Sequence, residues 1–268
     1  MRIFERAGIS PAAGAAGVLR WTARAVGAAA AAYAAYVATA WARYGDAPGP
    51  APEAADPLLD RFMPRYEVAE RHHIQVAAPA GITFAAAREM DLNQSRIARA
   101  IFRTRELVLG ADADTAARPQ GIVALTMSFG WGVLADVPGR EIVMGAVTQP
   151  WKANVVFRAL PPGEFAAFND PDYVKIVWTL RADPVDAAHS IFRTETRAVA
   201  TDAEARRKFR RYWSFLSPGI IVIRWMSLGP LKADAEQRAS SERRRKDVDQ
   251  GAQRWRAPSD SDTRKGPA

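Results

Sequence analysis

The sequence contains no cysteine and only three histidines among its 268 residues. Without cysteine the chain has no disulfide, no thiolate metal ligand and no thiol nucleophile. The histidines, His72, His73 and His189, leave little choice of general base, and no Gly-x-Ser-x-Gly sequence presents a nucleophilic serine. His72 and His73 are neighbours on a predicted strand, so their side chains point in opposite directions and cannot bind one ion together. We therefore predict no metal and no cofactor.

Motifs that bind nucleotides or nucleic acids are also missing. Gly130-Trp131-Gly132 is too short to hold a phosphate, and we interpret it as a bulge or a close approach of two backbones. The net charge of +8 comes from basic clusters, but no helix-turn-helix, zinc-finger or RNA-binding pattern accompanies them. These clusters favour anionic lipid headgroups or simple solvation, and we do not expect nucleic acid as a partner.

Charge is absent from Ala25 to Ala42, a run of eighteen residues that is about long enough for a helix to cross the hydrocarbon core of a bilayer. We predict a transmembrane helix or signal anchor over 25–44. The basic residues before the run slightly outnumber those after it, which favours a single-pass protein with a cytoplasmic N-terminus and the main domain on the outer face. Two alternatives stay open: a cleaved signal peptide, with Ala38-Thr39-Ala40 as cleavage site, and a soluble alanine-rich helix.

The remaining composition divides the chain into further parts. A basic segment, 1–24, precedes the uncharged run, and a proline- and alanine-rich linker, 45–60, follows it and is expected to hold the domain away from the membrane. One domain is expected over 61–246, and the polar residues 247–268 are predicted to be disordered.

Hydrophobic periodicity predicts the elements of this domain. Helices are expected at Ile82 to Met90, Ser95 to Leu107, and from a capping box at Thr201 and Glu204 onward to about Arg238, with an interruption at Pro218-Gly219. Gly121 to Ala135 has a β-like pattern, and Pro138-Gly139 suits a type II turn between two strands of a hairpin. The expected strands are Tyr66 to Val76, Trp131 to Asp136, Glu141 to Val147, Asn154 to Leu160, Lys175 to Ala182 and Ser190 to Ala200.

This order of elements, together with several local sequences, resembles the START-like superfamily, also known as the SRPBCC or helix-grip fold. The similarity covers about Phe62 to Arg238 and is carried by Ile74 to Ala80, Thr83-Phe84, Val133 to Glu141, Lys175 to Trp178, Thr194 to Arg197 and Phe209 to Trp213. It looks closest to uncharacterised bacterial members with an N-terminal apolar segment. The resemblance implies an α+β fold, in which a curved antiparallel sheet wraps around a long C-terminal helix. It also implies binding of lipids, sterols, quinones or polyketides, and in a few members cyclase or hydrolase activity.

Strand parity selects candidate site residues. Glu70 and His72 share one face of the first strand with Val68 and Ile74, so we expect both side chains to point inward, where they could orient a ligand headgroup or act as an acid/base pair. The expected ligand-binding residues are Glu70, His72, Trp131, Met144, Trp178, Thr194, Thr196, Trp213 and Leu216. Arg193, Glu195 and Arg197 face the other way and are expected to form an exterior ladder of ion pairs.

We therefore expect the protein to bind a hydrophobic small molecule or lipid at a membrane, without catalysis. Its expected partners are the lipid bilayer and that ligand, and a protein partner is left open. The basic residues expected to contact the membrane surface are Arg206, Arg207, Lys208, Arg210 and Arg211. Two alternatives remain: a cyclase- or hydrolase-like enzyme that uses Glu70 and His72, and a membrane-tethered scaffold with a filled cavity.

Overall fold

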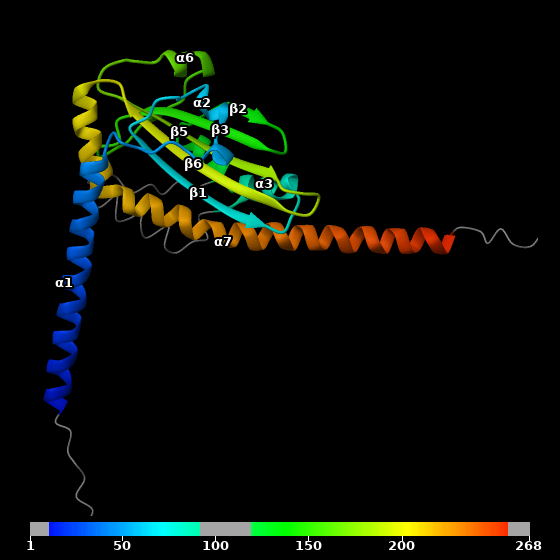
Figure 1. The fold of residues 1–268 in the computed structure, drawn as a ribbon, viewed down its shortest axis with the longest axis horizontal. Coiled ribbons are helices and arrows are strands. Elements are labelled where there is room, and N and C mark those ends of the chain that lie inside the picture. The colour runs from blue at the N-terminus through cyan, green and yellow to red at the C-terminus, as the bar shows by residue number, and fades with distance from the viewer. Residues whose placement is uncertain (1–10, 92–118, 257–268) are drawn as a thin grey trace, which may run out of the picture.

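A computed structural model describes residues 11–91 and 119–256 (Figure 1). Six antiparallel strands form one sheet in the order β1-β6-β5-β3-β2, and β4 pairs with the end of β3. The strands are β1 (Val68–Val76), β2 (Gly132–Val137), β3 (Glu141–Thr148), β4 (Phe157–Arg158), β5 (Val174–Pro184) and β6 (Ser190–Ala200). The helices are α1 (Pro11–Arg43), η1 (Pro52–Ala54), α2 (Pro57–Asp60), α3 (Ala80–Glu89), α5 (Ile122–Ser128), α6 (Pro162–Ala167) and α7 (Ala203–Arg256).

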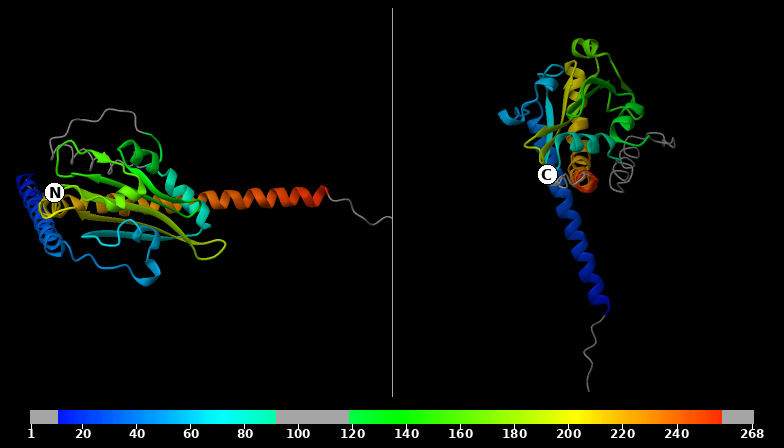
Figure 2. Two further views of the ribbon diagram at one scale, coloured as in Figure 1. Left: turned by 90° about the horizontal axis from the view of Figure 1, so that it is seen from above. Right: turned by 90° about the vertical axis from the view of Figure 1, so that its right-hand side faces the viewer.

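One face of the sheet packs against α7 and α3, which confirms the predicted α+β helix-grip arrangement. Figure 2 shows α7 lying along the sheet and continuing well beyond it. Leu228 and Leu231 of α7 join a buried cluster with residues from the centre of the sheet, such as Trp178 and Phe192. Lys232 also donates a hydrogen bond of 2.8 Å from Nζ to the carbonyl oxygen of Gln75 at the edge of the sheet. The core of the domain therefore lies between the sheet and α7.

Alternating apolar residues explain why the strands could be predicted. β6 has the bounds expected from the sequence, and β5 extends the expected strand at both ends. Arg140 donates its backbone N–H to the Val137 carbonyl, and Gly139 has a φ of 73°, as the predicted type II turn requires. The predicted close approach at Gly130 is also confirmed. A Cβ atom there would lie 2.2 Å from the Phe157 carbonyl oxygen, and φ is 93°.

Several local predictions were wrong. Residues 122–128 form a helix, α5, rather than a strand, because Gly121 with a φ of 84° turns the chain into the helix and Val123 and Leu125 pack inward at one end. The strand expected at 154–160 shortens to the two residues of β4. The helix α7 continues through 247–256, where the sequence predicted a disordered tail. The helix expected at 95–107 lies outside the described residues.

The capping box at the start of α7 is replaced by a different cap. Thr201 bonds instead with the backbone of Tyr173, donating from Oγ1 to its carbonyl oxygen at 3.0 Å. Asp202 caps the helix, because its Oδ1 accepts a hydrogen bond of 2.8 Å from the Ala205 N–H. Glu204 forms ion pairs with Arg207 and Lys208 and does not reach back.

The predicted linker is folded against the outer sheet face rather than extended as a spacer. Asp56 caps α2 by accepting a hydrogen bond of 2.8 Å from the Leu59 N–H. Leu59 is fully buried and packs with Phe62, Met63 and residues of β3 and β5. Four prolines permit this course, because the segment needs few backbone partners of its own.

α1 extends away from the body of the protein, and its last turns lie beside the first part of α7 (Figure 1). The Tyr33 hydroxyl donates to the Phe215 carbonyl at 2.7 Å, and the Tyr36 and Ser217 hydroxyls lie 2.9 Å apart. α7 bends near Pro218, which has no N–H for the helix ladder.

Candidate functional site

The polar residues predicted on the inner sheet face all lie on the side that packs against α7. β1 pairs with β6 in a register that sets Glu70 opposite Thr196 and His72 opposite Thr194. Val76 belongs to the same face of β1 and packs in the cluster that contains α7 residues. His73 points to the opposite face, as strand parity predicted.

An arginine from α7 completes this group. Arg224 donates a hydrogen bond of 3.0 Å from Nη1 to Oγ1 of Thr194. We call Glu70, His72, Thr194, Thr196 and Arg224 the polar cluster. Four of its residues come from the edge strand β1 and its neighbour β6, and the fifth comes from the helix that covers them.

Two buried atoms of the polar cluster, His72 Nε2 and Thr196 Oγ1, have no hydrogen-bond partner among the described residues. Glu70 lies within the electrostatic range of Arg224, but the described contacts include no ion pair between them. A buried polar group without a partner costs about 1–3 kcal/mol, and native proteins usually satisfy such groups with water or a ligand. The polar cluster therefore has two buried polar atoms that are available to water or to a bound molecule.

The electrostatics of the polar cluster favour neutral side chains on β1. Burial raises the pKa of the Glu70 carboxyl, and the charges of Arg224 and Arg71 oppose that rise. Burial also lowers the pKa of the His72 imidazole, and Arg224 and His73 lower it further. A neutral imidazole offers one donor and one acceptor. The polar cluster can thus donate from Arg224 and accept at Glu70, with His72 able to do either.

Apolar side chains surround the polar cluster. Trp178 lies directly opposite Thr196 on the neighbouring strand, and Met144 lies opposite Trp178 on the next. Both are buried in the main core cluster together with Leu180 and Phe192. Two of the apolar residues expected at the site, Met144 and Trp178, are therefore in the same layer as the polar cluster.

Of the other three expected site residues, Trp131 packs against the edge of the main core cluster, and Trp213 and Leu216 lie elsewhere. Trp213 packs with Phe209, at a ring separation of 5.9 Å, in a separate core cluster near the start of α7. Trp131 stacks on Phe157 at 5.1 Å at the far edge of the sheet. Leu216 is partly buried on α7, about two helical turns before Arg224. Sequence periodicity placed these residues on inward faces but could not tell which core cluster they join.

Two hollows border other parts of the fold. One of about 580 Å³ lies over the outer face of the sheet, between β1, β6 and the η1 segment, and is lined by charged residues such as Arg71, Arg181 and Arg193. The other, of about 550 Å³, lies between α3, α5 and the β2–β3 turn. Both are lined mainly by residues other than those of the predicted apolar cavity between the sheet and α7.

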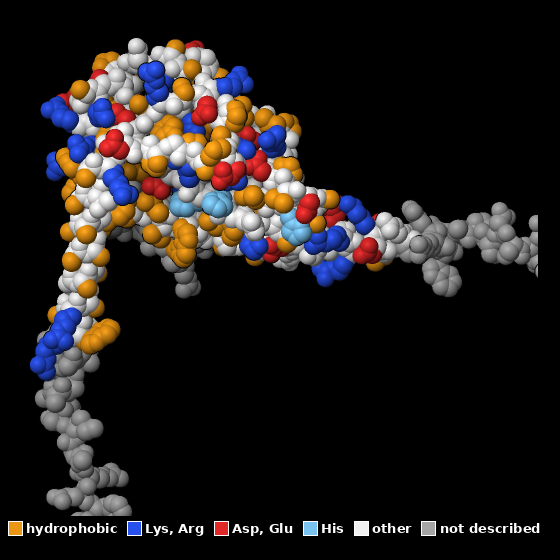
Figure 3. Space-filling view, viewed as in Figure 1, with side chains coloured by type: hydrophobic (Ala, Val, Ile, Leu, Met, Phe, Trp, Pro, Cys, Tyr) orange, Lys and Arg blue, Asp and Glu red, His pale blue; other side chains and the backbone are white. Residues whose placement is uncertain are grey.

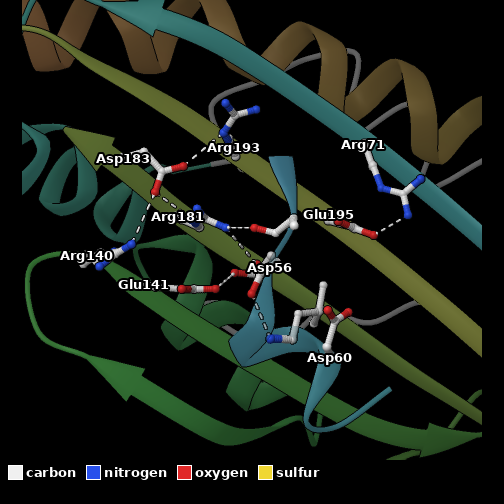
Figure 4. A network of polar contacts seen from close by, with 12 residues as sticks. Asp56, Asp60, Arg71, Arg140, Glu141, Arg181, Asp183, Arg193 and Glu195 are labelled. Atoms are coloured by element: carbon white, nitrogen blue, oxygen red, sulfur yellow. Dashed lines mark hydrogen bonds and ion pairs between the residues drawn. The ribbon is translucent and has the colours of Figure 1, made fainter. Parts of the chain in front are cut away.

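The outer face of the sheet carries a network of charged residues (Figure 4). Arg71 pairs with Glu195 at 2.8 Å, and Asp183 accepts from both Arg181 at 2.7 Å and Arg193 at 3.0 Å. We call this the outer-face network. Its members are Asp56, Asp60, Arg71, Arg140, Glu141, Arg181, Asp183, Arg193, Glu195 and Arg197.

The predicted ladder of Arg193, Glu195 and Arg197 belongs to this network but is not exterior. Arg197 is fully buried and bonds with Glu195 at 2.7 Å, because the segment before β1 covers it. Its Nη1 also contacts the Asp60 carboxylate at 2.5 Å and the Met63 carbonyl at 2.9 Å. These contacts attach the folded linker to the sheet, so the outer-face network has a structural role.

Most of the basic residues predicted to contact lipid pair within the protein. Arg206 contacts Glu67 at 3.2 Å, and Lys208 contacts Asp172 at 2.7 Å. Arg210 donates to the Trp41 carbonyl of α1 at 2.6 and 3.0 Å. With Arg207 also paired to Glu204, Arg211 alone of the five is exposed with no described partner.

Sequence reasoning missed Arg224, although a signal for it exists. Arg224 is the only charged residue between Arg211 and Lys232, in the most apolar part of α7. A single charge inside an apolar helical stretch usually has a specific partner. The long-range pairing with Thr194 could not be read from periodicity.

Among the residues that the structure describes, two helices are long and apolar enough to cross a membrane. One is the Arg20–Arg43 part of α1, with a mean hydropathy of 1.3 in its most apolar window and none of that window buried. The other is the Ala203–Gln250 part of α7, with a mean hydropathy of 1.2 and 22% of the window buried. A signal sequence or the core helix of a soluble protein would meet the same criteria.

No protein-family model and no curated protein matches this chain. Among solved structures, it is similar to the Mll3558 protein from Rhizobium loti at 13% identity and a TM-score of 0.24, over 58% of this chain and 95% of that one. It is similar to the Zhui aromatase/cyclase from Streptomyces sp. R1128 at 14% identity and a TM-score of 0.22, over 63% and 94%. A third match is the di-domain ARO/CYC BexL from the BE-7585A biosynthetic pathway, at 16% identity and 0.21, over 63% and 46%.

Proposed function

We propose that this protein binds an apolar small molecule, such as a lipid or an isoprenoid-like compound, between its sheet and α7. The observation that carries the proposal is the pair of unpartnered buried atoms, His72 Nε2 and Thr196 Oγ1, inside an otherwise apolar layer. A ligand with an apolar body and a hydroxyl or carbonyl group would satisfy them. Each methylene that it buries adds about 0.8 kcal/mol of affinity.

The polar cluster orients such a ligand by its polar end. Arg224 donates to a carbonyl or carboxylate, and Glu70 accepts from a hydroxyl. The Trp178 and Met144 side chains then line the apolar body. His72 Nε2 and Thr196 Oγ1 have no hydrogen-bond partner among the described side chains. The polar group of the ligand would supply that partner, so it would determine the specificity of binding.

The test uses the full chain purified in detergent, native mass spectrometry and extraction of bound molecules. A reproducible apolar mass is expected, and His72→Gln should reduce it while His73→Gln, on the opposite sheet face, leaves it unchanged. A purified protein that carries no bound molecule and binds neither a fluorescent fatty acid nor a quinone would contradict the proposal. That result would favour the scaffold alternative.

We further propose that α1 anchors the domain in a membrane as a single-pass helix, with the N-terminus in the cytoplasm and the domain on the outer face. The support is the uncharged run of residues 25–42, its exposure along the helix and the aromatic Trp21 and Trp41 near its ends. Membrane fractionation with carbonate extraction tests the anchor. Release of the full-length chain would contradict it, and a shortened soluble chain would identify a signal peptide.

Catalysis is a second candidate function, favoured by the opposite pKa shifts of Glu70 and His72. A carboxyl whose pKa is raised by burial is better suited to act as an acid, and an imidazole whose pKa is lowered by burial is better suited to act as a base. Turnover of a polyketide- or ester-like substrate that is lost in Glu70→Gln, with ligand binding retained, would support it. Binding without turnover in the wild type would leave binding as the function.

A further inference from the structure

α7 carries an exposed apolar stripe next to α1. Phe215 is 46% exposed, Val222 is 40% exposed and Trp225 is 67% exposed. Phe215 and Val222 are seven residues apart and Trp225 follows three later, so all three lie near one face of the helix. Figure 3 shows hydrophobic side chains along α1 and on the adjoining underside of the domain. We call residues 215–228 of α7 the α7 elbow.

Contacts with α1 fix the height of the α7 elbow along that helix. Phe215 lies at the level of Tyr33 and Ser217 at the level of Tyr36, through the two hydroxyl contacts described above. Farther up, Arg210 contacts the Trp41 carbonyl. The first part of α7 therefore descends beside α1, and the bend near Pro218 then turns it away from α1 and along the sheet (Figure 1).

This height conflicts with a domain that stands clear of the bilayer. Tyr36 and Tyr33 lie six and nine residues below Ala42, which at about 1.5 Å per residue is roughly 9–14 Å. If residues 25–42 span the hydrocarbon, their upper end is near Trp41, a residue type that prefers the interface. The start of the α7 elbow, at Phe215 and Ser217, is then below the interface, on the hydrocarbon side of it.

We propose that the α7 elbow is inserted into the outer leaflet of the same bilayer that α1 spans. This inference rests on the proposed anchoring by α1. The lipid acyl chains are the occupant of the stripe, because the stripe is continuous with the uncharged surface of α1 and its exposed side chains are apolar. Arg211, one turn before Phe215 and without a described partner, lies on the headgroup side. The apolar part of α7 ends at Lys232, where charged residues begin, and the helix continues beyond it in the same direction (Figure 1).

The insertion also gives the proposed ligand a short route. Trp225 follows Arg224 directly, so the acyl chains and the polar cluster are separated only by the thickness of α7. A lipid-like ligand would pass from the leaflet to the polar cluster without crossing water.

The experiment exploits the absence of cysteine. Single-cysteine variants of the full chain, Val222→Cys in the α7 elbow, Ala31→Cys in α1 and Ala167→Cys in α6, are labelled with an environment-sensitive fluorophore. The last site is exposed and lies on the far side of the domain from the free end of α1 (Figure 1). The proteins are inserted into vesicles of phosphatidylcholine and phosphatidylglycerol with brominated acyl chains, and aqueous iodide is the second quencher.

The expected result is loss of emission to brominated lipid at positions 222 and 31, and loss to iodide only at position 167. Lipid quenching at 31 but not at 222 would overturn the inserted α7 elbow and leave the anchor intact. Quenching by lipid at neither position would overturn the anchor and the elbow together. Shielding of 222 from both quenchers would assign the stripe to a second copy of the chain and also overturn the proposal. Trp225→Cys repeats the test if Val222→Cys alters the circular dichroism spectrum.

Discussion

The hydroxyl of Thr196 lies on a strand at the centre of the domain, buried and without a hydrogen-bond partner among the described residues. Thr148 provides the contrast, because this buried residue donates its hydroxyl to the Val156 carbonyl at 2.8 Å. Both threonines are buried, but only the Thr148 hydroxyl forms a hydrogen bond that stabilises the fold. A buried hydroxyl without a partner costs stability, and water, an ion or a ligand can remove that cost.

Thr196→Val should therefore stabilise the ligand-free protein by about 1 kcal/mol, because it removes an unpaired buried hydroxyl at nearly constant volume. It should also weaken binding of the co-purified ligand. Thr148→Val is the matched control and should destabilise by about 1 kcal/mol, since it leaves a carbonyl unpaired. Thermal unfolding of the full chain in detergent, followed by circular dichroism, measures both. Equal losses of stability in the two variants would show that Thr196 is paired in solution.

Glu141 gives the outer-face network a pH dependence. Burial next to Asp56 raises the pKa of its carboxyl from 4.5 to about 8, with Arg181 opposing the rise. Since the folded state holds the proton more tightly than the unfolded state, this group's contribution is complete below about pH 4.5 and is lost as pH rises through about 8.

We expect the stability difference between wild type and Glu141→Gln to change across that window, by roughly a few kcal/mol. The variant mimics the protonated form, so it should be the more stable protein above about pH 8 and close to wild type below about pH 4.5. Thermal unfolding at several pH values gives the two profiles. Parallel profiles throughout would mean that Glu141 is ionised in the folded protein at neutral pH.

At the scale of single elements, the start of α7 depends on a side chain that the sequence pattern did not select. Asp202 accepts hydrogen bonds from the N–H groups of Ala205 and Asp172, and these bonds lower the pKa of its carboxyl. Thr201-x-x-Glu204 also fits the capping-box pattern, but the Thr201 hydroxyl forms hydrogen bonds with the backbone N–H and carbonyl of Tyr173 instead. Thr201 and Asp202 could each cap the helix, and the contact of Thr201 with the distant Tyr173 leaves Asp202 as the cap.

Asp202→Ala should lower the thermal midpoint measurably, because it removes the helix cap and the contact to Asp172. Glu204→Gln should cost no more than a few tenths of a kcal/mol, since it affects only exposed ion pairs on the first turn. The thermal midpoints of the two variants provide the comparison. A larger loss for Glu204→Gln would restore the capping box as the functional cap.

Elements with a clear period could be predicted from the sequence, and elements held by distant partners could not. β6 alternates between Thr194 or Thr196 inside and charged residues outside, and its bounds followed directly from that pattern. α5 and α2 are short, and both depend on apolar contacts with distant parts of the chain. Likewise, Glu70 and His72 could be placed on the inner face by parity, whereas Arg224 reaches them only through the packing of α7 on the sheet.

At the scale of the molecule, the folded linker makes the domain larger than the predicted 61–246. Arg181 donates to the Ala55 carbonyl at 2.8 Å and lies 3.9 Å from the Asp56 carboxylate. Tyr44, near the end of α1, is buried and donates its hydroxyl to Glu67. The domain therefore begins at about Tyr44, and residues 44–60 are part of it.

A fragment that begins at Leu58 should be less stable than one that begins at Tyr44, by about 3–5 kcal/mol. The shorter fragment leaves the buried Arg181 without two of its partners and removes the cap of α2. Urea unfolding of the two fragments measures the difference, and both fragments lack α1. Equal midpoints would show that the linker contributes nothing to the fold.

The junction between α1 and the sheet has a consequence for how the protein meets other molecules. Gly45 donates its N–H to the Glu67 carbonyl at 3.0 Å, immediately after α1 ends, so no flexible hinge separates that helix from β1. A domain on a loose tether sweeps out a volume and samples every orientation. Here, with α1 in a bilayer, the domain would turn only about the membrane normal, always at one height. Its search would be two-dimensional, and each encounter with a ligand donor would depend on lateral diffusion within the membrane.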